Sequence, residues 1–410
     1  MSFESALTGL NAAAASLDVT GHNIANGQTH GFKASRAEFA DIFAMSHLGV
    51  ARNAIGQGVR LTNVQQMFEQ GQPEFTQNAL DMMVAGEGFF RMDNNGAISY
   101  TRAGNFQMDR EGYIINPSNH RLTGFQVGPD GNISNAIGPL QIKTGNVPAE
   151  PTDAMTVAAN LPAFAEQMDM VDFDPDDSST FHHSSSTTVF DLLGREHMIS
   201  LYFIKTDDPS REWHVEARLD GEAATTHVGV LTFGADGALD TLNPDPPAIT
   251  FATGAGTPLE GANALDVEFD LQDMTQFGSP YSVATLRPTG FAAGEFSSLG
   301  VERDGTILAR YTNGQTELLG QVALAKFAAP QNLQAVGDTA WVETFDSGAP
   351  IMGNPETGDF GSVQSGALEQ ANVNISEQLV KMITAQRSYQ ANAKMISTQD
   401  AITQELMNIR

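Results

Sequence analysis

The chain lacks several features that would point to common chemistries. Its 410 residues include no cysteine, which excludes a disulfide framework, thiolate metal sites and a thiol nucleophile. Basic residues are scarce, since 21 Lys and Arg stand against 49 Asp and Glu and give a formal net charge of -28. A chain this acidic is repelled by nucleic acids and by anionic membrane surfaces, so we expect no nucleic-acid partner.

Long hydrophobic runs are also missing. No uninterrupted stretch of about 18 apolar residues occurs, so we expect no segment to insert into a membrane. The first residues, MSFESALTGLNAAAASL, have neither a basic region nor a solid apolar stretch, and so differ from a conventional cleaved signal peptide. If the protein acts outside the cell, we expect an export route that removes no signal peptide.

Matching apolar stripes are present at the two ends of the chain. The N-terminal stripe runs mostly in steps of three and four through Phe3, Leu7, Leu10, Ala14, Leu17 and Ile24. The C-terminal stripe is formed by Ile375, Leu379, Met382, Tyr389, Ala393 and Ile396, and after a shift of frame by Met395, Ile402, Leu406 and Ile409. A period near 3.5 residues predicts helices that pack on each other or on copies of themselves. We therefore expect residues 1–27 and 375–410 to form a helical coiled-coil domain.

Between the ends the pattern changes to short alternating runs that predict β-strands. Residues 71–145 contain the turn candidates Asn95-Gly96 and Asp130-Gly131, and residues 282–361 contain Asp304-Gly305 and Asn313-Gly314. Because the two stretches share this style, we expect them to form one discontinuous β domain. Residues 28–70 contain Gly31, Gly49, Gly56, Gly58 and several polar residues, and predict an extended, irregular connector, to which residues 362–374 return.

Residues 146–281 form a second β block with a distinct charge. Between Glu150 and Asp273 the chain has 24 acidic and 4 basic residues, so most of the net charge lies here. Strand candidates are spaced along the block, and we expect an inserted domain resembling a β-barrel or sandwich. The predicted fold class is mainly β with long, paired terminal helices. High surface charge favours solubility when copies crowd together.

Candidate chemical sites in the middle of the chain are weak. Gly86-Glu87-Gly88 lacks the third glycine of a dinucleotide loop and precedes an apolar pair, not a helix. His182-His183 lies in a Ser/Thr-rich loop without other histidines at metal-ligand spacing. A solvated loop accounts for the histidine pair.

An acidic run superficially resembles a calcium loop, through Asp172, Asp174, Asp176 and Asp177. Pro175 lies inside it, no glycine occupies the turn position, and the twelfth position is His183. An acidic surface run is the better interpretation. With no nucleophile–base arrangement either, we expect no enzymatic activity, no cofactor and no metal.

The sharpest local motif follows the N-terminal stripe and comprises Asn23, Ile24, Ala25, Asn26, Thr29, Gly31, Phe32 and Lys33. By itself it predicts a helix end capped by side-chain amides. The string also resembles the NIAN–T–GFK signature of the bacterial flagellar axial proteins, which comprise rod, hook and filament-junction subunits. Residues 379–394, which include Gln386 and Arg387, resemble the C-terminal signature of that family. Residues 85–90 and 100–106 are similar to its core β domain.

The resemblance implies a structural subunit that polymerises into a tube. The chain's length and its inserted acidic block favour the hook branch of the family. Such a subunit would form a flexible, curved joint that transmits torque from rod to filament around a central export channel. The implied partners are copies of itself, rod subunits below, the hook–filament junction protein above, the hook cap during assembly and the flagellar type III export apparatus.

Two other functions fit parts of the sequence. A distal rod subunit has similar ends but is shorter and lacks a large inserted domain. A secreted β-rich adhesin, oligomerised by its terminal helices, belongs to a different class. Loss of tube formation after deletion of residues 1–25 or 380–410 would separate a tube subunit from an adhesin.

Overall fold

The computed structural model describes residues 3–42, 56–170, 173–207, 211–224, 227–254 and 257–408. The chain divides into two compact units. The helical unit comprises Met1–Thr144, Ser298–Arg310 and Thr316–Arg410, and the inserted unit comprises Gly145–Ser297 and Tyr311–Gln315. Among the described residues, none of the helices combines the length and apolar character needed to cross a membrane.

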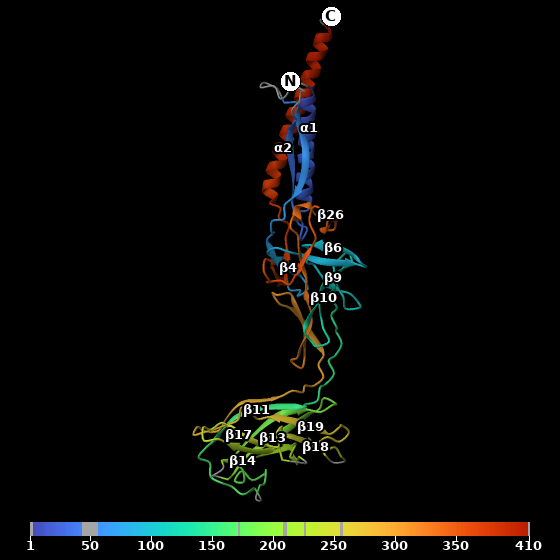
Figure 1. The fold of residues 1–410 in the computed structure, drawn as a ribbon. Helices are drawn as coiled ribbons and strands as arrows, with labels where there is room; N and C mark the ends of the chain where they lie inside the picture. The colour runs from blue at the N-terminus through green and yellow to red at the C-terminus, as the bar shows by residue number, and fades with distance from the viewer. Residues whose placement is uncertain are drawn as a thin grey trace. The chain divides into compact units, whose positions relative to one another are not determined.

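The two long helices lie at the ends of the chain, as predicted. Helix α1 spans Phe3–Ala25 and helix α2 spans Ile375–Asn408, and the two run side by side (Figure 1). Their direction is antiparallel, because the side chain of Asn23 lies beside that of Gln378 whereas Gly9 lies beside Asn392. The prediction of paired terminal helices is confirmed.

A β-hairpin packs along α1. Strand β1 (Ser35–Ile42) pairs antiparallel with β2 (Gly58–Gln66). The Val59 amide donates a hydrogen bond of 3.4 Å to the hydroxyl of Thr8 on α1. Much of the region 28–70, which we expected to be irregular, is therefore regular β structure. The glycines misled that prediction: Gly31 and Gly56 lie outside the strands, whose backbone groups pair with each other.

The helical unit also contains a large sheet. Its main strand order is β22-β23-β24-β9-β5-β6-β27-β26, and β7, β8, β10, β25 and β28 attach to this path. Strands from residues 71–145 pair with strands from residues 282–361, since β9 pairs with β24, β5 with β25 and β6 with β27. The strand bounds are β5 Phe89–Asn94, β6 Ala97–Thr101, β7 Gln107–Met108, β8 Ile114–Ile115, β9 Arg121–Val127, β10 Ile133–Pro139, β22 Phe296–Val301, β23 Thr306–Tyr311, β24 Thr316–Val322, β25 Leu324–Lys326, β26 Gln334–Gly337, β27 Ala340–Val342 and β28 Ile351–Gly353.

Short strand pairs bring the end of the chain back to its beginning. Strand β29 (Ser362–Ser365) pairs with β4 (Met82–Ala85), and β30 (Ala367–Glu369) pairs with β3 (Pro73–Phe75). Residues 362–374, expected to be a connector, thus contribute strands to the β structure. A 3₁₀ turn, η2, spans Pro330–Asn332.

Two predicted hairpin turns have different outcomes. Asn95-Gly96 joins β5 to β6 as a two-residue turn, with φ of 51° and 93°. Both values are positive, as a type I′ turn requires, so this prediction is confirmed. The prediction of a two-residue turn at Asp130-Gly131 is wrong. These residues lie in a longer loop, 128–132, closed by a 2.7 Å hydrogen bond from the Gly128 amide to the Asn132 carbonyl.

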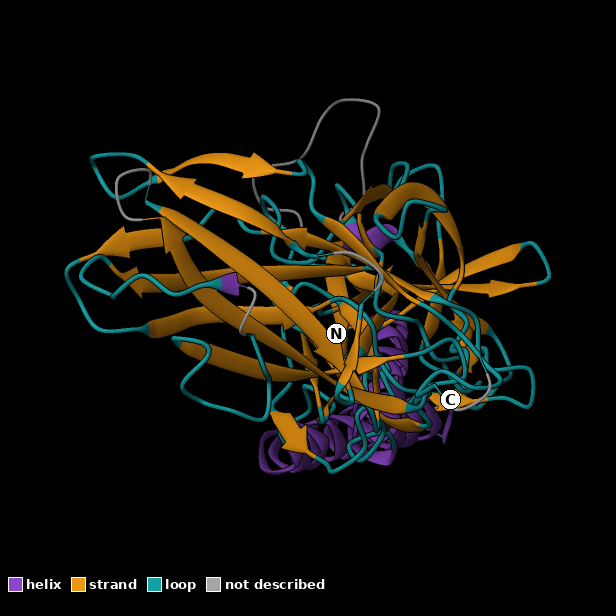
Figure 2. Ribbon diagram, turned by 90° about the horizontal axis from the view of Figure 1, so that it is seen from below, coloured by secondary structure: helices purple, strands orange, loops and turns teal. Residues whose placement is uncertain are grey.

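Two sheets form the inserted unit. One has the order β18-β19-β11-β20 with β21 on β11, and the other has the order β12-β13-β14-β16-β17 with β15 on β14. Outside the terminal helices, strands account for nearly all regular structure, so the mainly β fold class is confirmed (Figure 2). The bounds are β11 Ala154–Pro162, β12 His183–Phe190, β13 Glu196–Asp207, β14 Glu212–Leu219, β15 Glu222–Ala223, β16 Gly229–Phe233, β17 Leu239–Asn243, β18 Ala248–Phe251, β19 Leu265–Asp270, β20 Thr275–Phe277 and β21 Ser282–Pro288.

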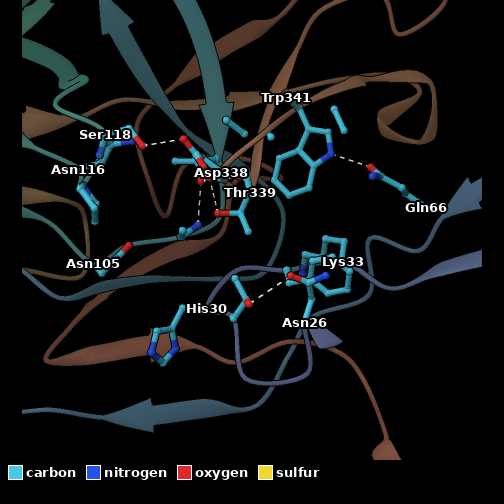
Figure 3. A pocket seen from close by; sticks show the side chains of 18 of the residues that line it. Asn26, His30, Lys33, Gln66, Asn105, Asn116, Ser118, Asp338, Thr339 and Trp341 are labelled. Carbon is cyan, nitrogen blue, oxygen red and sulfur yellow. Dashed lines mark hydrogen bonds between the residues drawn. The ribbon is translucent and has the colours of Figure 1, made fainter. Parts of the chain in front are cut away.

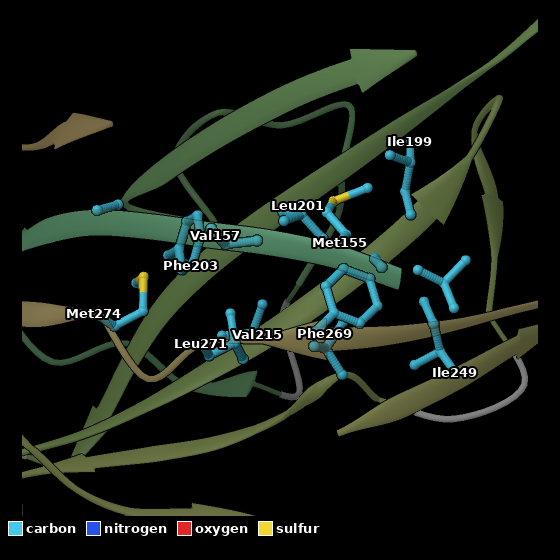
Figure 4. Close-up of a cluster of buried hydrophobic side chains, with 14 of the residues drawn as sticks. Met155, Val157, Ile199, Leu201, Phe203, Val215, Ile249, Phe269, Leu271 and Met274 are labelled. Carbon is cyan, nitrogen blue, oxygen red and sulfur yellow. The ribbon is translucent and has the colours of Figure 1, made fainter. Parts of the chain in front are cut away.

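The core of the inserted unit lies between these sheets. Every second residue of β14 is buried, beginning with Trp213 and Val215, and these side chains belong to one hydrophobic cluster with Val157 and Phe269 from the other sheet. Figure 4 shows Val157, Val215 and Phe269 in this cluster. This alternation is typical of a sandwich with one solvated face on each sheet. Strand β21 pairs with β11, so the unit continues past the expected end at residue 281, because the chain adds one more strand before leaving.

We predict that the two units unfold as separable transitions. Replacing Phe203, fully buried in the inserted unit, by Ala lowers that unit's unfolding free energy by about 3–5 kcal/mol. The chain's two tryptophans report on the units separately, because Trp213 lies in the inserted unit and Trp341 in the helical unit. Urea unfolding followed by fluorescence in Trp341→Phe and Trp213→Phe backgrounds measures each transition.

The exposed Met198→Ala is the control, and it leaves both transitions within about 0.5 kcal/mol of the parent. An equal shift of both transitions by Phe203→Ala would contradict the division into two units.

Candidate assembly site

The helix pair is held together by small side chains. On α1 the buried positions are Ala6, Ala13, Thr20 and Asn23. On α2 they include Gln378 and Ala385. A Cβ placed on Gly9 would lie 2.9 Å from the Asn392 amide nitrogen, so the helices approach closely there. We did not predict this stripe, because we followed large apolar residues; the spacing of small residues by three, four or seven positions was the available signal.

The predicted stripes of large apolar residues lie mostly on other faces of the helices. Leu10, Leu17 and Ile24 on α1 are half-buried, as are Met382 and Ile396 on α2. The exposed members are Phe3, Leu7, Ile375, Leu379, Tyr389, Met395 and Ile402. Ile409 and the side chain of Leu406 lie outside the described residues. On α2, Val380 (64% exposed) and Ile383 (50%) add to this uncovered apolar surface.

Asn23 lies near the C-terminal end of α1 and connects the two helices there. Its side chain accepts a 2.9 Å hydrogen bond from the Ser35 amide and donates one of 2.7 Å to the Ser35 carbonyl. The same amide group lies 3.4 Å from the Gln378 side-chain oxygen. One buried side chain therefore joins α1, β1 and α2. Asn26 donates to the His22 carbonyl at 2.9 Å, so the predicted amide capping of the helix end is confirmed.

The motif continues through a tight turn. Gly31 has φ of 69°, and a Cβ there would lie 2.4 Å from the Ala103 nitrogen, so only glycine fits. Its amide donates to the Glu369 carbonyl at 2.7 Å. The Thr29 hydroxyl lies 3.4 Å from the Asn26 side-chain oxygen, and Phe32 contacts the His22 ring edge-on. Ala25 is exposed.

A buried ionic cluster lies directly after this turn. The Lys33 ammonium group is 2.6 Å from one Glu369 carboxylate oxygen, and the Arg102 guanidinium is 3.4 Å from the other. Lys33 also donates to the Glu69 carbonyl at 2.8 Å, and the Gly71 amide donates to Glu369 at 2.8 Å. All three charged side chains are at most 6% exposed. Burial lowers the pKa of Lys33 and of Arg102, and the nearby carboxylate opposes that shift.

The cluster brings together segments that are distant in sequence. Lys33 belongs to the N-terminal motif, Arg102 to the segment 100–106, and Glu369 to strand β30, which leads into α2. Glu369 was missed from sequence, because a single acidic residue in a strand gives no signal. Gln386 and Arg387, from the C-terminal motif, lie exposed on α2 and do not join the cluster.

A pocket of about 530 Å³ opens beside the turn, lined by Asn26, His30 and Trp341 among others (Figure 3). The Trp341 indole donates to the Gln66 side chain at 2.6 Å, and the Ser118 hydroxyl donates to Asp338 at 2.9 Å. In both pairs the hydrogen bond joins two side chains of the pocket wall.

The other predicted chemical candidates have local structural contacts. His182 Nε2 lies 2.6 Å from the Glu166 carbonyl, and His183 stacks on Tyr281. Carboxylates of Asp174 and Asp177 accept backbone amides of their own loop. Asp172 lies outside the described residues. Within the part of the chain that the structure describes, no group of three or more His, Asp or Glu is placed to hold a metal ion.

Comparisons with known families give matches along the chain. The family model "Flagella basal body rod protein" matches residues 3–33, and "Flagellar basal body rod FlgEFG protein C-terminal" matches residues 364–409. "Flagellar hook protein FlgE/F/G D1 domain" matches residues 83–160, and "Flagellar basal body protein FlaE D2 domain" matches residues 156–291.

Individual relatives match over their whole length. The flagellar hook protein FlgE of Escherichia coli is 36% identical over 414 residues, covering 100% of both chains. FlgE of Salmonella typhimurium is 35% identical over 419 residues, also covering 100% of both chains. The crystal structure of flagellar hook protein FlgE2 from Helicobacter pylori is similar in fold, with a TM-score of 0.56 at 14% identity. That similarity covers 72% of this chain and 100% of the other.

We predict that the Glu369 carboxylate is essential for the stability of the helical unit. Glu369→Gln leaves Lys33 and Arg102 buried without a counter-charge and lowers the unfolding free energy by about 3–5 kcal/mol. Urea unfolding followed by Trp341 fluorescence in a Trp213→Phe background measures this loss.

Glu377→Gln is a matched control, because Glu377 pairs with Lys381 at 2.7 Å on the exposed surface of α2. It changes the unfolding free energy by about 0.5 kcal/mol or less. If the two variants lose similar stability, the ionic cluster does not have the importance assigned to it.

Proposed function

The chain belongs to the flagellar hook protein family and is a structural subunit of the bacterial flagellar hook, and from that premise we propose that it polymerises through its terminal helices. Full-length similarity to hook proteins does not favour the distal rod subunit or the secreted adhesin. The proposed polymer is a flexible, curved tube that transmits motor torque from rod to filament and encloses an export channel.

The uncovered apolar surface of the helix pair carries this proposal. Leu379, Val380 and Ile383 are each 45% or more exposed on consecutive turns of α2. Burial of apolar surface contributes about 25 cal/mol per Å², so a continuous exposed row favours association. The small residues between α1 and α2 cannot cover it, whereas a neighbouring copy can.

In the proposed arrangement, each part of the chain has its own role in the polymer. Residues 1–27 and 375–410 form the assembling helical domain, and residues 28–70 with 362–374 link it to the discontinuous β domain of 71–145 and 282–361. The acidic insertion at 146–281 keeps crowded copies soluble, because like charges resist non-specific contact. Repeated head-to-tail contacts between copies generate an open helical assembly instead of a closed ring.

The proposed neighbours are rod subunits below the hook and the hook–filament junction protein above it. We also propose that the hook cap directs assembly, and that the flagellar type III export apparatus delivers the subunit to an extracellular site beyond the basal body. Limited stability of the helix pair in the free subunit keeps subunits from assembling early, since most of the stability of helices in proteins comes from packing.

We predict that polar substitutions on the exposed face of α2 abolish polymerisation without unfolding the subunit. Val380→Ser combined with Ile383→Ser raises the concentration needed for polymer formation at least about tenfold, because each copy loses more than about 1.4 kcal/mol of contact energy. Sedimentation and electron microscopy of the purified protein measure polymer formation.

Ile351→Ser is the control, because Ile351 is 58% exposed but lies on β28, away from the helices in sequence and structure. It leaves polymerisation unchanged. Normal tubes from the Val380→Ser/Ile383→Ser variant would refute assembly through α2.

A further inference from the structure

The two ends of the helix pair expose different kinds of side chain. We call the end that contains the start of α1 and the end of α2 the tip. At its tip, large apolar side chains of both helices are exposed: Phe3 and Leu7 on α1, and Met395, Ile402 and Met407 on α2. Figure 1 shows α2 continuing past the end of α1 at this tip. Met407 is 68% exposed there, so these residues extend apolar surface that α1 does not cover.

Nearer the sheet, a groove of about 580 Å³ remains between α1, α2 and the β1–β2 hairpin. Small side chains line most of it: Gly9, Ala12, Ala13, Ser16 and Thr20 on α1, Thr384, Ala385 and Ser388 on α2, and Ala37 on β1. The groove is continuous with the interface of the helix pair. Its size and apolar lining suit large side chains that the chain itself does not place there.

The charges at the two ends are also complementary. Arg36 and Lys381 line the groove, and the exposed Arg387 follows one helical turn after Thr384. Arg36 and Lys381 pair with Glu38 and Glu377, and Arg387 is an exposed basic residue of α2 next to the lining residue Ser388. Among the described residues of the tip, Glu4, Asp400 and Glu405 are exposed acidic residues and Lys394 is an exposed basic one. Such complementarity favours one orientation of approach over its reverse.

We infer that the tip of one helix pair inserts into the groove of the next copy of this chain. Large apolar side chains at the tip fill the space left by small ones in the groove, and acidic residues meet basic ones. Tip and groove are different surfaces of one chain, so the contact is head-to-tail and continues without closing. The inference rests on the proposed polymerisation and adds which surfaces meet and in which direction.

Cysteine cross-linking tests the contact directly, because the chain has no cysteine of its own. Met407→Cys marks the tip and Thr384→Cys marks the groove. The two positions are about 35 Å apart on one straight helix, at 1.5 Å per residue, so they cannot form a disulfide within one chain. Oxidised polymers of the double variant should give a ladder of cross-linked chains, whereas each single variant should stay monomeric on a denaturing gel.

The possible results separate the inference from the function on which it rests. A polymer of the double variant that gives no ladder, or dimers from Met407→Cys alone, overturns the tip-to-groove contact and leaves tube formation intact. Failure of the unmodified protein to polymerise removes both claims. A ladder from the double variant supports both.

A second variant keeps the inference testable if the cysteine variants assemble poorly. Thr384→Trp fills the groove but leaves the tip free, so a blocked copy can add to a growing end and then prevents further addition. One blocked copy in about ten should shorten the polymers several-fold. Gln390→Trp is the control, since Gln390 is exposed on α2 outside the groove. Equal polymer lengths with both variants would overturn the inference.

Discussion

The small side chains between α1 and α2 are the constraint on which the rest of the structure depends. Two helices that meet through Ala6, Gly9, Ala13 and Ala385 come close together but bury little apolar area. The most exposed of their larger apolar residues, Leu379, Val380 and Ile383, face outward, where a single chain has nothing to cover them. The same choice of side chains therefore produces a weakly stabilised helix pair and a strong tendency to associate.

An exposed helix pair can transmit force only if its base is firmly attached. The buried carboxylate of Glu369 provides that attachment, because it binds Lys33 from the N-terminal segment and Arg102 from the sheet, immediately before the chain enters α2. Asn23 joins the two helices to the hairpin in the same region. The motif that marks the family is thus the junction between the assembling helices and the β structure, and its buried charges pair with each other.

Sequence reasoning predicted the parts of this arrangement that depend on periodicity. The terminal helices, about half of the strands of the inserted unit and the Asn95-Gly96 turn follow from spacing and turn chemistry, and the structure contains them. The hairpin of β1 and β2 was not predicted, because its regularity arises from packing on α1. Glu369 was not predicted either, because its role comes from contacts with residues more than 250 positions away. The stripe of small residues was visible in the sequence, but large apolar residues a few positions away gave the more familiar signal.

The central claim is that copies of the chain complete a helix pair that is incomplete alone. Amide hydrogen exchange of the monomer and the polymer tests it most directly, because exchange reports local opening of helices. The account predicts that amides of α1 and of residues 375–402 exchange quickly in the monomer and become strongly protected in the polymer, while the β sheets change little. Equal protection of the helices in both states would show that the single chain already completes them, and would contradict the account.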